Sequence, residues 1–228
     1  MRPALPIIMS ITGGYVDTAG FLALHGLFTG HVTGNIVMLG AALLHEGSST
    51  YAKMLAVPVF CATIVIMRFV IDRLRLPESV SLRTMVAVKL VMLTLGSVSA
   101  ISLAPFTAPN GLSLVLTGML LVIAMAIQNA AHRTHLASAP PSNVMTGTMT
   151  QMMVDLGEML AGRMTPDAKV ATRARLKGML YAVLGFVTGC GAAALGFGLA
   201  GTWCFALPPF LGLATLLLVI SEPTKQPE

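Results

Sequence analysis

Charged residues are scarce in this chain of 228 residues, because Asp, Glu, Lys and Arg together make up only 10% of it. A soluble domain carries about a quarter. Aromatic residues are also few, at 6%, whereas hydrophobic residues reach 55% and the mean hydropathy is +0.82. This balance excludes an ordinary soluble protein and indicates an integral membrane protein. The apolar stretches are long and continuous, which predicts spanning helices rather than the alternating strands of an outer-membrane barrel.

Sequence motifs for catalysis, cofactors and metals are missing as well. The three cysteines are isolated and lie within or at the ends of apolar segments, which argues against a disulfide framework or a metal site. There is no HExxH pair, Walker motif or CxxCH. The net charge of +5 arises mostly from Lys and Arg in two short hydrophilic loops, so it does not indicate nucleic acid. We therefore expect no enzyme activity, no cofactor, no resident metal and no nucleic-acid partner.

Apolar segments divide the chain into spanning and short elements. A helix needs about 20 predominantly apolar residues to cross a bilayer. Two stretches, 33–45 and 146–160, are too short to cross. Each follows an opening rich in Gly and Thr or in Pro, which predicts a half-helix that begins inside the membrane. Six stretches are long enough to span: 5–27, 51–71, 84–105, 110–131, 177–199 and 203–221.

The distribution of charge predicts the orientation of these segments. The loops 68–83 and 163–177 are rich in Arg and Lys, whereas 106–110 and 200–202 carry no charge. Basic loops stay on the cytoplasmic side, so both termini are expected in the cytoplasm and residues 46–50 outside. The first short element then starts and ends outside, and the second starts and ends inside. Both are therefore expected to be re-entrant, from opposite faces.

A short polar phrase occurs once in each half, as Val32-Thr33-Gly34-Asn35 and as Met145-Thr146-Gly147-Thr148. Each copy follows a polar patch at a nearly equal offset, around Asp17 in one half and Asn129 in the other. This duplication predicts an all-α polytopic fold with six transmembrane helices and two oppositely oriented half-helices. The halves 1–107 and 108–228 would form a 3+3 inverted repeat within one membrane domain. If each short element crossed fully instead, the chain would have eight crossings and a parallel repeat.

The two phrases predict a binding site. A half-helix that begins at mid-depth presents unpaired backbone N–H groups and a partial positive charge at its N-terminus. Two such termini near the midplane suit an anion or the electron-rich end of a neutral solute. The Thr residues can cap the helices and the Gly residues let a ligand approach the backbone. The alternative is that the Thr-Gly pairs only permit tight packing. The predicted solute-binding residues of the phrases are Thr33, Gly34, Asn35, Thr146, Gly147 and Thr148.

Polar residues within the spanning segments extend this predicted site. Asp17 lies near the middle of the first segment, where a carboxylate is most unfavourable. It is predicted to carry protons or to contact the solute, and a purely structural, hydrogen-bonded carboxyl is the alternative. Tyr15, Gln128 and Asn129 complete the predicted solute-binding set. Asp155, in the second short element, is expected to pair with a base such as Lys89, Arg133 or Lys177.

The same residues carry a resemblance to a known family. Gly14-Tyr15-Val16-Asp17, followed by Phe28, Val32-Thr33-Gly34-Asn35 and Gly40, is similar to the YoaK-like bacterial inner-membrane proteins, a family of unknown function. The resemblance covers essentially the whole chain, and the Gly-Tyr-Val-Asp and Thr-Gly-Asn motifs are its most specific part. It implies a multi-pass protein of the bacterial inner membrane. It supplies neither a substrate nor a site.

The residues favour a small secondary transporter that binds an anionic or polar solute near the midplane. A homodimer is expected, because a chain of 23.8 kDa has little mass for both a moving part and a fixed scaffold. One alternative is a passive channel of hourglass form, lined by the same two half-helices. Another is a membrane scaffold without transport, in which the repeat only determines packing. A carrier should show saturation and counterflow, whereas a channel should show high flux without counterflow.

Overall fold

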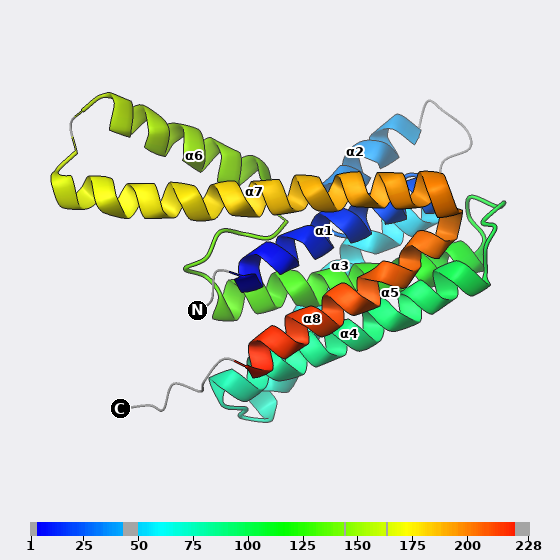
Figure 1. Ribbon diagram of the computed structural model, residues 1–228. Coiled ribbons are helices and arrows are strands. Elements are labelled where there is room, and N and C mark those ends of the chain that lie inside the picture. The colour runs from blue at the N-terminus through cyan, green and yellow to red at the C-terminus, as the bar shows by residue number, and fades with distance from the viewer. Residues whose placement is uncertain (1–3, 43–49, 144, 163, 222–228) are drawn as a thin grey trace.

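A bundle of helices forms the whole described part of the chain, which comprises residues 4–42, 50–143, 145–162 and 164–221 of the computed structural model. These residues contain no strand, as the sequence predicted. Figure 1 shows long helices lying side by side, with two shorter helices, α2 and α6, on one side of the bundle. In chain order the elements are α1 (Ala4–Ala23), α2 (Val32–Ala42), α3 (Thr50–Arg73), α4 (Glu78–Ser102), α5 (Leu112–His135), α6 (Met145–Leu160), α7 (Pro166–Ala200), the 3-10 helix η1 (Gly201–Ala206) and α8 (Leu207–Ile220).

Five helical stretches in the described residues are long and apolar enough to cross a membrane: α1, α3, α4, α5 and the continuous stretch 166–220. The sequence predicted two spanning segments in this last stretch. It comprises α7 and α8, and α8 runs back from the end of α7 to pack on α1 and α4 (Figure 1). However, α8 has only 14 residues, about 21 Å, which is shorter than the roughly 30 Å hydrocarbon layer.

The two short elements form where the sequence predicted them. Helix α2 has 11 residues and α6 has 16, so neither is long enough to span the membrane. Residues 43–45 of the first predicted element lie outside the described residues, and so do residues 46–49 and both termini. The predicted sides of the membrane for these segments therefore stay predictions.

Both predicted basic loops are mostly helical, which corrects the sequence prediction. Helix α3 continues to Arg73 and α4 begins at Glu78, so only 74–77 connect them. Helix α7 begins at Pro166, within the predicted loop 163–177. Arg and Lys are good helix formers, and their long side chains allow helices to extend beyond the apolar layer. The start of α7 is well specified, because the Thr165 side chain accepts a hydrogen bond from Ala168 N at 3.4 Å and Pro occupies the first turn.

The packing of the helices follows a similar pattern in the two halves. Helix α1 packs against α7 and α8, while α5, its counterpart in the second half, packs against α3 and α4. Each short helix packs against the long helix that follows it, α2 on α3 and α6 on α7. Helices α1 and α7 run in one direction, and α3 and α5 run in the opposite direction (Figure 1). If each helix is replaced by the helix at the same place in the other half, every one of these contacts becomes another contact that the structure contains.

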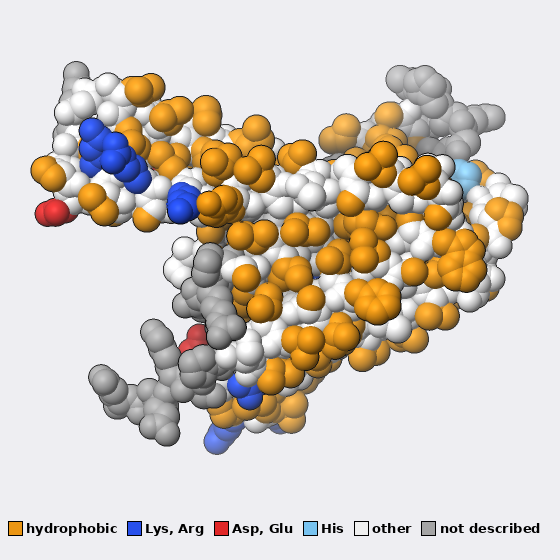
Figure 2. Space-filling view, in the orientation of Figure 1, with side chains coloured by type: hydrophobic (Ala, Val, Ile, Leu, Met, Phe, Trp, Pro, Cys, Tyr) orange, Lys and Arg blue, Asp and Glu red, His pale blue; other side chains and the backbone are white. Residues whose placement is uncertain are grey.

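Hydrophobic side chains cover most of the face shown in Figure 2, whereas Lys and Arg gather at the end that includes the start of α7 and the connection between α3 and α4. Many large apolar residues are exposed on α3 and α7, among them Ile66, Phe69, Val187 and Leu199. An apolar surface with basic residues at one end is what a protein embedded in a bilayer presents.

Glycine permits very close packing between α1 and α7. A Cβ atom added at Gly189 would lie 2.2 Å from the carbonyl oxygen of Ile11, and one added at Gly14 would lie 2.1 Å from that of Phe186. Both distances are to backbone atoms, which cannot move aside as a flexible side chain can. Small residues allow this approach in membrane bundles, where close van der Waals packing holds helices together.

Substituting Gly189→Ala should therefore lower the free energy of unfolding by about 1–3 kcal/mol, the usual effect of overpacking. The matched control is Gly191→Ala on the same helix, because a Cβ added at Gly191 meets nothing within 4 Å. Thermal unfolding of the purified protein in one detergent compares the two. Equal stability of the two variants would contradict the close contact between α1 and α7.

Candidate functional site

The segment between α1 and α2 turns back into the bundle and is held there by Asp17. The turn occurs at His25 and Gly26, both of which have positive φ. Oδ1 of Asp17 then accepts hydrogen bonds from the backbone N–H of Thr29 at 2.7 Å and of Gly30 at 2.8 Å. Asp17 lies six residues before the end of α1. These hydrogen bonds therefore hold the returning segment against the side of that helix.

The second oxygen of Asp17 fixes a histidine at the start of α2. Oδ2 of Asp17 lies 2.5 Å from Nδ1 of His31, and the carboxylate is almost fully buried. The His31 ring also contacts the ring of Phe186 on α7. Its side chain remains 37% exposed, so the imidazole is held on one side and open on the other.

Asn35 ties this first loop to α2. Its side-chain oxygen accepts from Phe28 N at 2.9 Å, and its side-chain nitrogen donates to Phe28 O at 2.7 Å. The oxygen and the nitrogen of this buried amide are thus both hydrogen-bonded to the backbone of Phe28. Asn35 therefore has a structural role in this geometry, although the sequence predicted it to bind solute.

A second loop, 136–143, returns from the end of α5 towards the start of α6. Here Gln128 occupies the place that Asp17 has in the first half. Its Nε2 donates to Met9 O at 2.8 Å and makes longer contacts to Ser142 Oγ at 3.3 Å and Asn143 Oδ1 at 3.4 Å. The second loop is thus contacted by a neutral amide and by His132, whose Nε2 lies 3.1 Å from Ala139 O, whereas a carboxylate holds the first.

The two loops meet inside the molecule. A Cβ atom added at Gly30 would lie 3.1 Å from Nδ2 of Asn143, and one added at Gly13 would lie 2.0 Å from Oδ1 of the same side chain. Each short helix begins two residues after this contact, α2 at Val32 and α6 at Met145. The N-termini of both short helices therefore lie near one point.

Two buried polar atoms at this junction have no hydrogen-bond partner in the described part of the chain, namely Asn143 Nδ2 and Gln128 Oε1. Asn143 is 4% exposed and Gln128 is fully buried. A buried polar group without a partner costs about 1–3 kcal/mol, so a native site that contains one requires an explanation. The junction therefore contains one donor and one acceptor whose partners are not among the described residues.

The residues of the repeated phrase differ in exposure. Thr33 and Thr146 are exposed, as is Gly147, whereas Thr148 is buried. Helices α2 and α6 begin at Val32 and Met145, so each Thr occupies the second helical position rather than the predicted cap. Gly34 faces a ring, because an added Cβ would lie 2.8 Å from Phe28 Cδ2.

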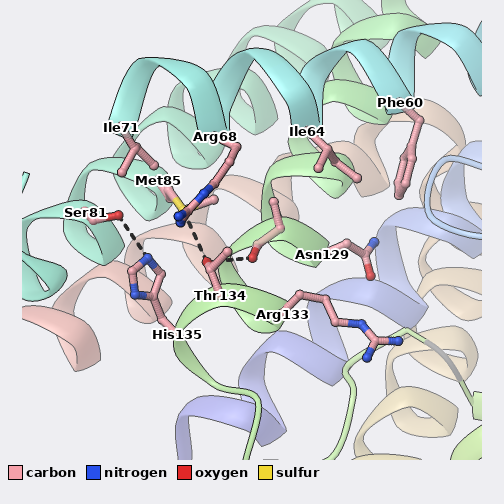
Figure 3. A pocket seen from close by; sticks show the side chains of 11 residues that line it. Phe60, Ile64, Arg68, Ile71, Ser81, Met85, Asn129, Arg133, Thr134 and His135 are labelled. Atoms are coloured by element: carbon pink, nitrogen blue, oxygen red, sulfur yellow. Dashed lines mark hydrogen bonds between the residues drawn. The ribbon is translucent and has the colours of Figure 1, made fainter. Parts of the chain in front are cut away.

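Two predicted residues lie away from the junction. The Tyr15 hydroxyl donates to the carbonyl oxygen of Cys204 at 2.8 Å, which fastens η1 to α1. Asn129 donates to Met125 O at 3.0 Å and lines a separate cavity between α3, α4 and α5 (Figure 3). In the described residues, no group of three or more His, Cys, Asp or Glu side chains is placed to hold a metal ion.

Asp155 is paired with Arg175, which corrects the prediction of Lys89, Arg133 or Lys177. The guanidinium donates from Nε to Oδ2 and from Nη2 to Oδ1, both at 2.6 Å, and Gln151 adds a bond at 2.7 Å. The predicted loop is helical at this point. Helix α7 therefore places Arg175, rather than Lys177, opposite Asp155 on α6. The bidentate pair fixes α6 against α7.

Sequence reasoning missed two polar residues near the core and gave a third an incorrect partner. Ser142 and Asn143 follow a Pro-Pro pair outside the repeated phrase, so no spacing rule indicated them. Lys89 stands out as a lysine inside the apolar stretch 84–105, but the sequence suggested only a pairing with Asp155 for it. In the structure Lys89 is 1% exposed, and its Nζ has no hydrogen-bond partner among the described residues.

Comparison with known proteins gives a consistent result. A family profile described as "Protein of unknown function (DUF1275)" matches residues 5–218. The UPF0700 transmembrane protein YoaK of Bacillus subtilis (strain 168) is 27% identical over 163 residues, which cover 70% of this chain and 69% of that protein. No solved structure matches. The resemblance to YoaK-like proteins, inferred from the motifs around Asp17 and Thr33, is confirmed.

Substituting Asp17→Ala should release the first loop and lower the free energy of unfolding by at least about 2 kcal/mol, because hydrogen bonds to a charged group each contribute about 1.5–3 kcal/mol. Hydrogen exchange measured by mass spectrometry should show faster exchange in peptides that contain Thr29 and Gly30. Asp72→Ala is the control, since its ion pair with Arg68 is exposed and contributes about 0–1 kcal/mol. Unchanged exchange in Asp17→Ala would contradict the role assigned to the carboxylate.

Substituting Lys89→Met should stabilise the protein by about 1–3 kcal/mol, because an apolar side chain of similar volume replaces a buried amino group without a partner among the described residues. Lys53→Met is the matched control. Lys53 is equally buried, but its Nζ donates to His25 O at 3.0 Å, so its loss should destabilise. Both are measured by thermal unfolding in the same detergent. Destabilisation of similar size in both variants would show that Lys89 has a stabilising partner.

Proposed function

This chain belongs to the DUF1275 family of proteins of unknown function, and we propose that it is a secondary transporter for a small anionic or polar solute. The meeting of the two returning loops at Gly30 and Asn143 carries this proposal. The proposed site lies between the N-termini of α2 and α6. It contains the Thr-Gly pairs of both halves, with Asn143 as a donor and Gln128 as an acceptor.

The chemistry of the junction supports an anion or a hydrogen-bond acceptor as the solute. The first N–H groups of a helix have no partner within the helix, and the helix dipole favours negative charge there. Asn143 Nδ2 adds a donor that lacks a partner among the described residues. Gln128 Oε1 accepts from a neutral solute that also carries a donor. Broken or short helices whose ends point at the substrate are a recurring feature of secondary transporters.

The proposal includes a 3+3 inverted repeat. It is supported by the same order of long and short helices in both halves, by contacts that interchange when the halves are exchanged, and by counterparts such as α1 and α5 that run in opposite directions (Figure 1). Such a repeat gives two similar halves that can rock against each other around a fixed site, the basis of alternating access. We place the basic end of Figure 2 in the cytoplasm of a bacterial inner membrane, with a homodimer as the assembled form.

The Asp17–His31 pair is the proposed proton-sensitive element. Asp17 is fully engaged with the first loop, which favours a positioning role for the carboxylate itself. His31 is more accessible and shares the second carboxylate oxygen. A proton gained or lost by the pair would change both the charge beside α2 and the restraint on the loop. In the second half Gln128 does not titrate, and the titratable group beside the loop is His132, whose Nε2 lies 3.1 Å from the carbonyl oxygen of Ala139.

A ligand-stabilisation screen on purified protein tests the site. Chloride, nitrate, phosphate, acetate, amino acids, nucleobases and sugars are each added at up to millimolar concentration, and the melting temperature is recorded. A ligand that binds only the folded state must raise it. We expect one class to give a concentration-dependent rise. Thr146→Ala and Asn143→Ala should each require at least tenfold more ligand for the same rise.

Thr150→Ala is the matched control, because Thr150 lies one turn along α6 and its hydroxyl donates to the helix carbonyl of Thr146. It should respond like the unmodified chain. No rise from any class, or a rise that survives both site variants, would overturn the proposed site. With the solute known, counterflow in proteoliposomes separates a carrier from the passive channel that the sequence left open.

A further inference from the structure

A cavity lies between α3, α4 and α5, apart from the junction. Its volume is about 410 Å³, within the range of about 300–1,000 Å³ usual for small-molecule sites. Figure 3 shows its lining side chains, with Phe60 and Ile64 towards one end and Ser81 and His135 towards the other. Neither Asn143 nor Gln128, the donor and acceptor of the proposed transport site, lines this cavity.

The polarity of this cavity changes along its length. Phe60 and Ile64 lie in the middle of α3, whereas Arg68 lies near its basic end, together with Ser81 and His135 from α4 and α5. From Phe60 to Ile71 the helix rises about 16 Å. Because α3 is a spanning helix, the cavity runs from the apolar layer towards the headgroup region. A lipid molecule has the same order of apolar and polar parts.

The charge at the polar end suits an anion. Arg68 is paired only with Asp72 in the described residues, at 3.1 Å, and both side chains are more than half exposed, so this pair contributes little. Arg133 on α5 is exposed and forms no ion pair in the described part of the chain. Its side chain extends beside Asn129, away from Arg68, in Figure 3. Long exposed side chains change rotamer within nanoseconds, so both guanidinium groups can turn to one phosphate.

Two acidic groups lie close to the polar end of the cavity. Glu78 lies 3.8 Å from Nδ1 of His135, and Asp72 and Glu78 line a neighbouring cavity with Arg75. Neither carboxylate lines the larger cavity between α3, α4 and α5. The outer face of α3 is apolar, with Val65, Ile66 and Phe69 exposed, as expected for a helix in contact with lipid.

We propose that this cavity binds one anionic phospholipid, with its phosphate between Arg68 and Arg133 and an acyl chain against Phe60 and Ile64. Basic pockets between spanning helices on the cytoplasmic side are suited to acidic lipid headgroups. A free anion would use only the polar end, and a zwitterionic lipid would bring its own positive charge close to the two arginines.

Native mass spectrometry of the purified chain tests this proposal, with phosphatidylglycerol and phosphatidylcholine of identical acyl chains as probes. We expect at least tenfold tighter binding of phosphatidylglycerol. The double substitution Arg68→Gln and Arg133→Gln should remove most of this preference. Both residues are exposed, so the variant should fold, which its melting temperature checks. Arg73→Gln is the control, because Arg73 is exposed near the same end of α3 and does not line the cavity.

Ile64→Trp fills the apolar end and should weaken binding of phosphatidylglycerol without altering the two arginines. Equal binding of the two lipids, or equal loss of preference in Arg73→Gln, would overturn the proposal. Glycerol phosphate that competes as strongly as the intact lipid would assign the cavity to a soluble anion instead. Because these measurements involve no transported solute, their failure leaves the transporter proposal to its own test.

Discussion

A polypeptide that returns inside a membrane must satisfy its backbone N–H and C=O groups without water. This requirement determines the centre of the fold. Asp17 accepts from the backbone of Thr29 and Gly30, and Asn35 engages both polar groups of Phe28. With these partners the chain can turn back from α1 into the bundle and start a short helix there. Without them, the backbone of this segment would be buried without hydrogen-bond partners, and we would expect the two loops not to meet.

Close contact between the halves gives this arrangement a rigid frame. Glycines at the crossing of α1 and α7 bring two backbones together, and the Tyr15 hydroxyl joins α1 to η1. The Asp155–Arg175 pair fixes α6 to α7 in turn. Asp17, Tyr15 and Gly14 are near neighbours on α1, so one short stretch of sequence supports the first loop, η1 and the contact with α7.

Much of the fold follows from the sequence because membrane helices are encoded locally. Length and polarity predicted most of the spanning helices and both short elements, and Asp17 was identified from its unfavourable position. Its partners could not be predicted, since they depend on how the loop folds back. The same reason explains Asn35, Asn143 and Arg175, whose contacts join separate segments. The basic loops were misjudged because polarity marks the edge of the bilayer, whereas helix termination depends on turn and capping residues.

The two loops also differ in how firmly they are anchored. Short bonds to a carboxylate hold the first, whereas the second is held by an amide with contacts of 3.3 and 3.4 Å to the loop side chains and by His132, 3.1 Å from the carbonyl oxygen of Ala139. Charge-assisted hydrogen bonds are the stronger kind. Local opening in a protein occurs first where the least free energy is lost, so we expect the loop before α6, which no carboxylate holds, to open more often than the first. Two loops of similar placement would then differ in how often each exposes its backbone.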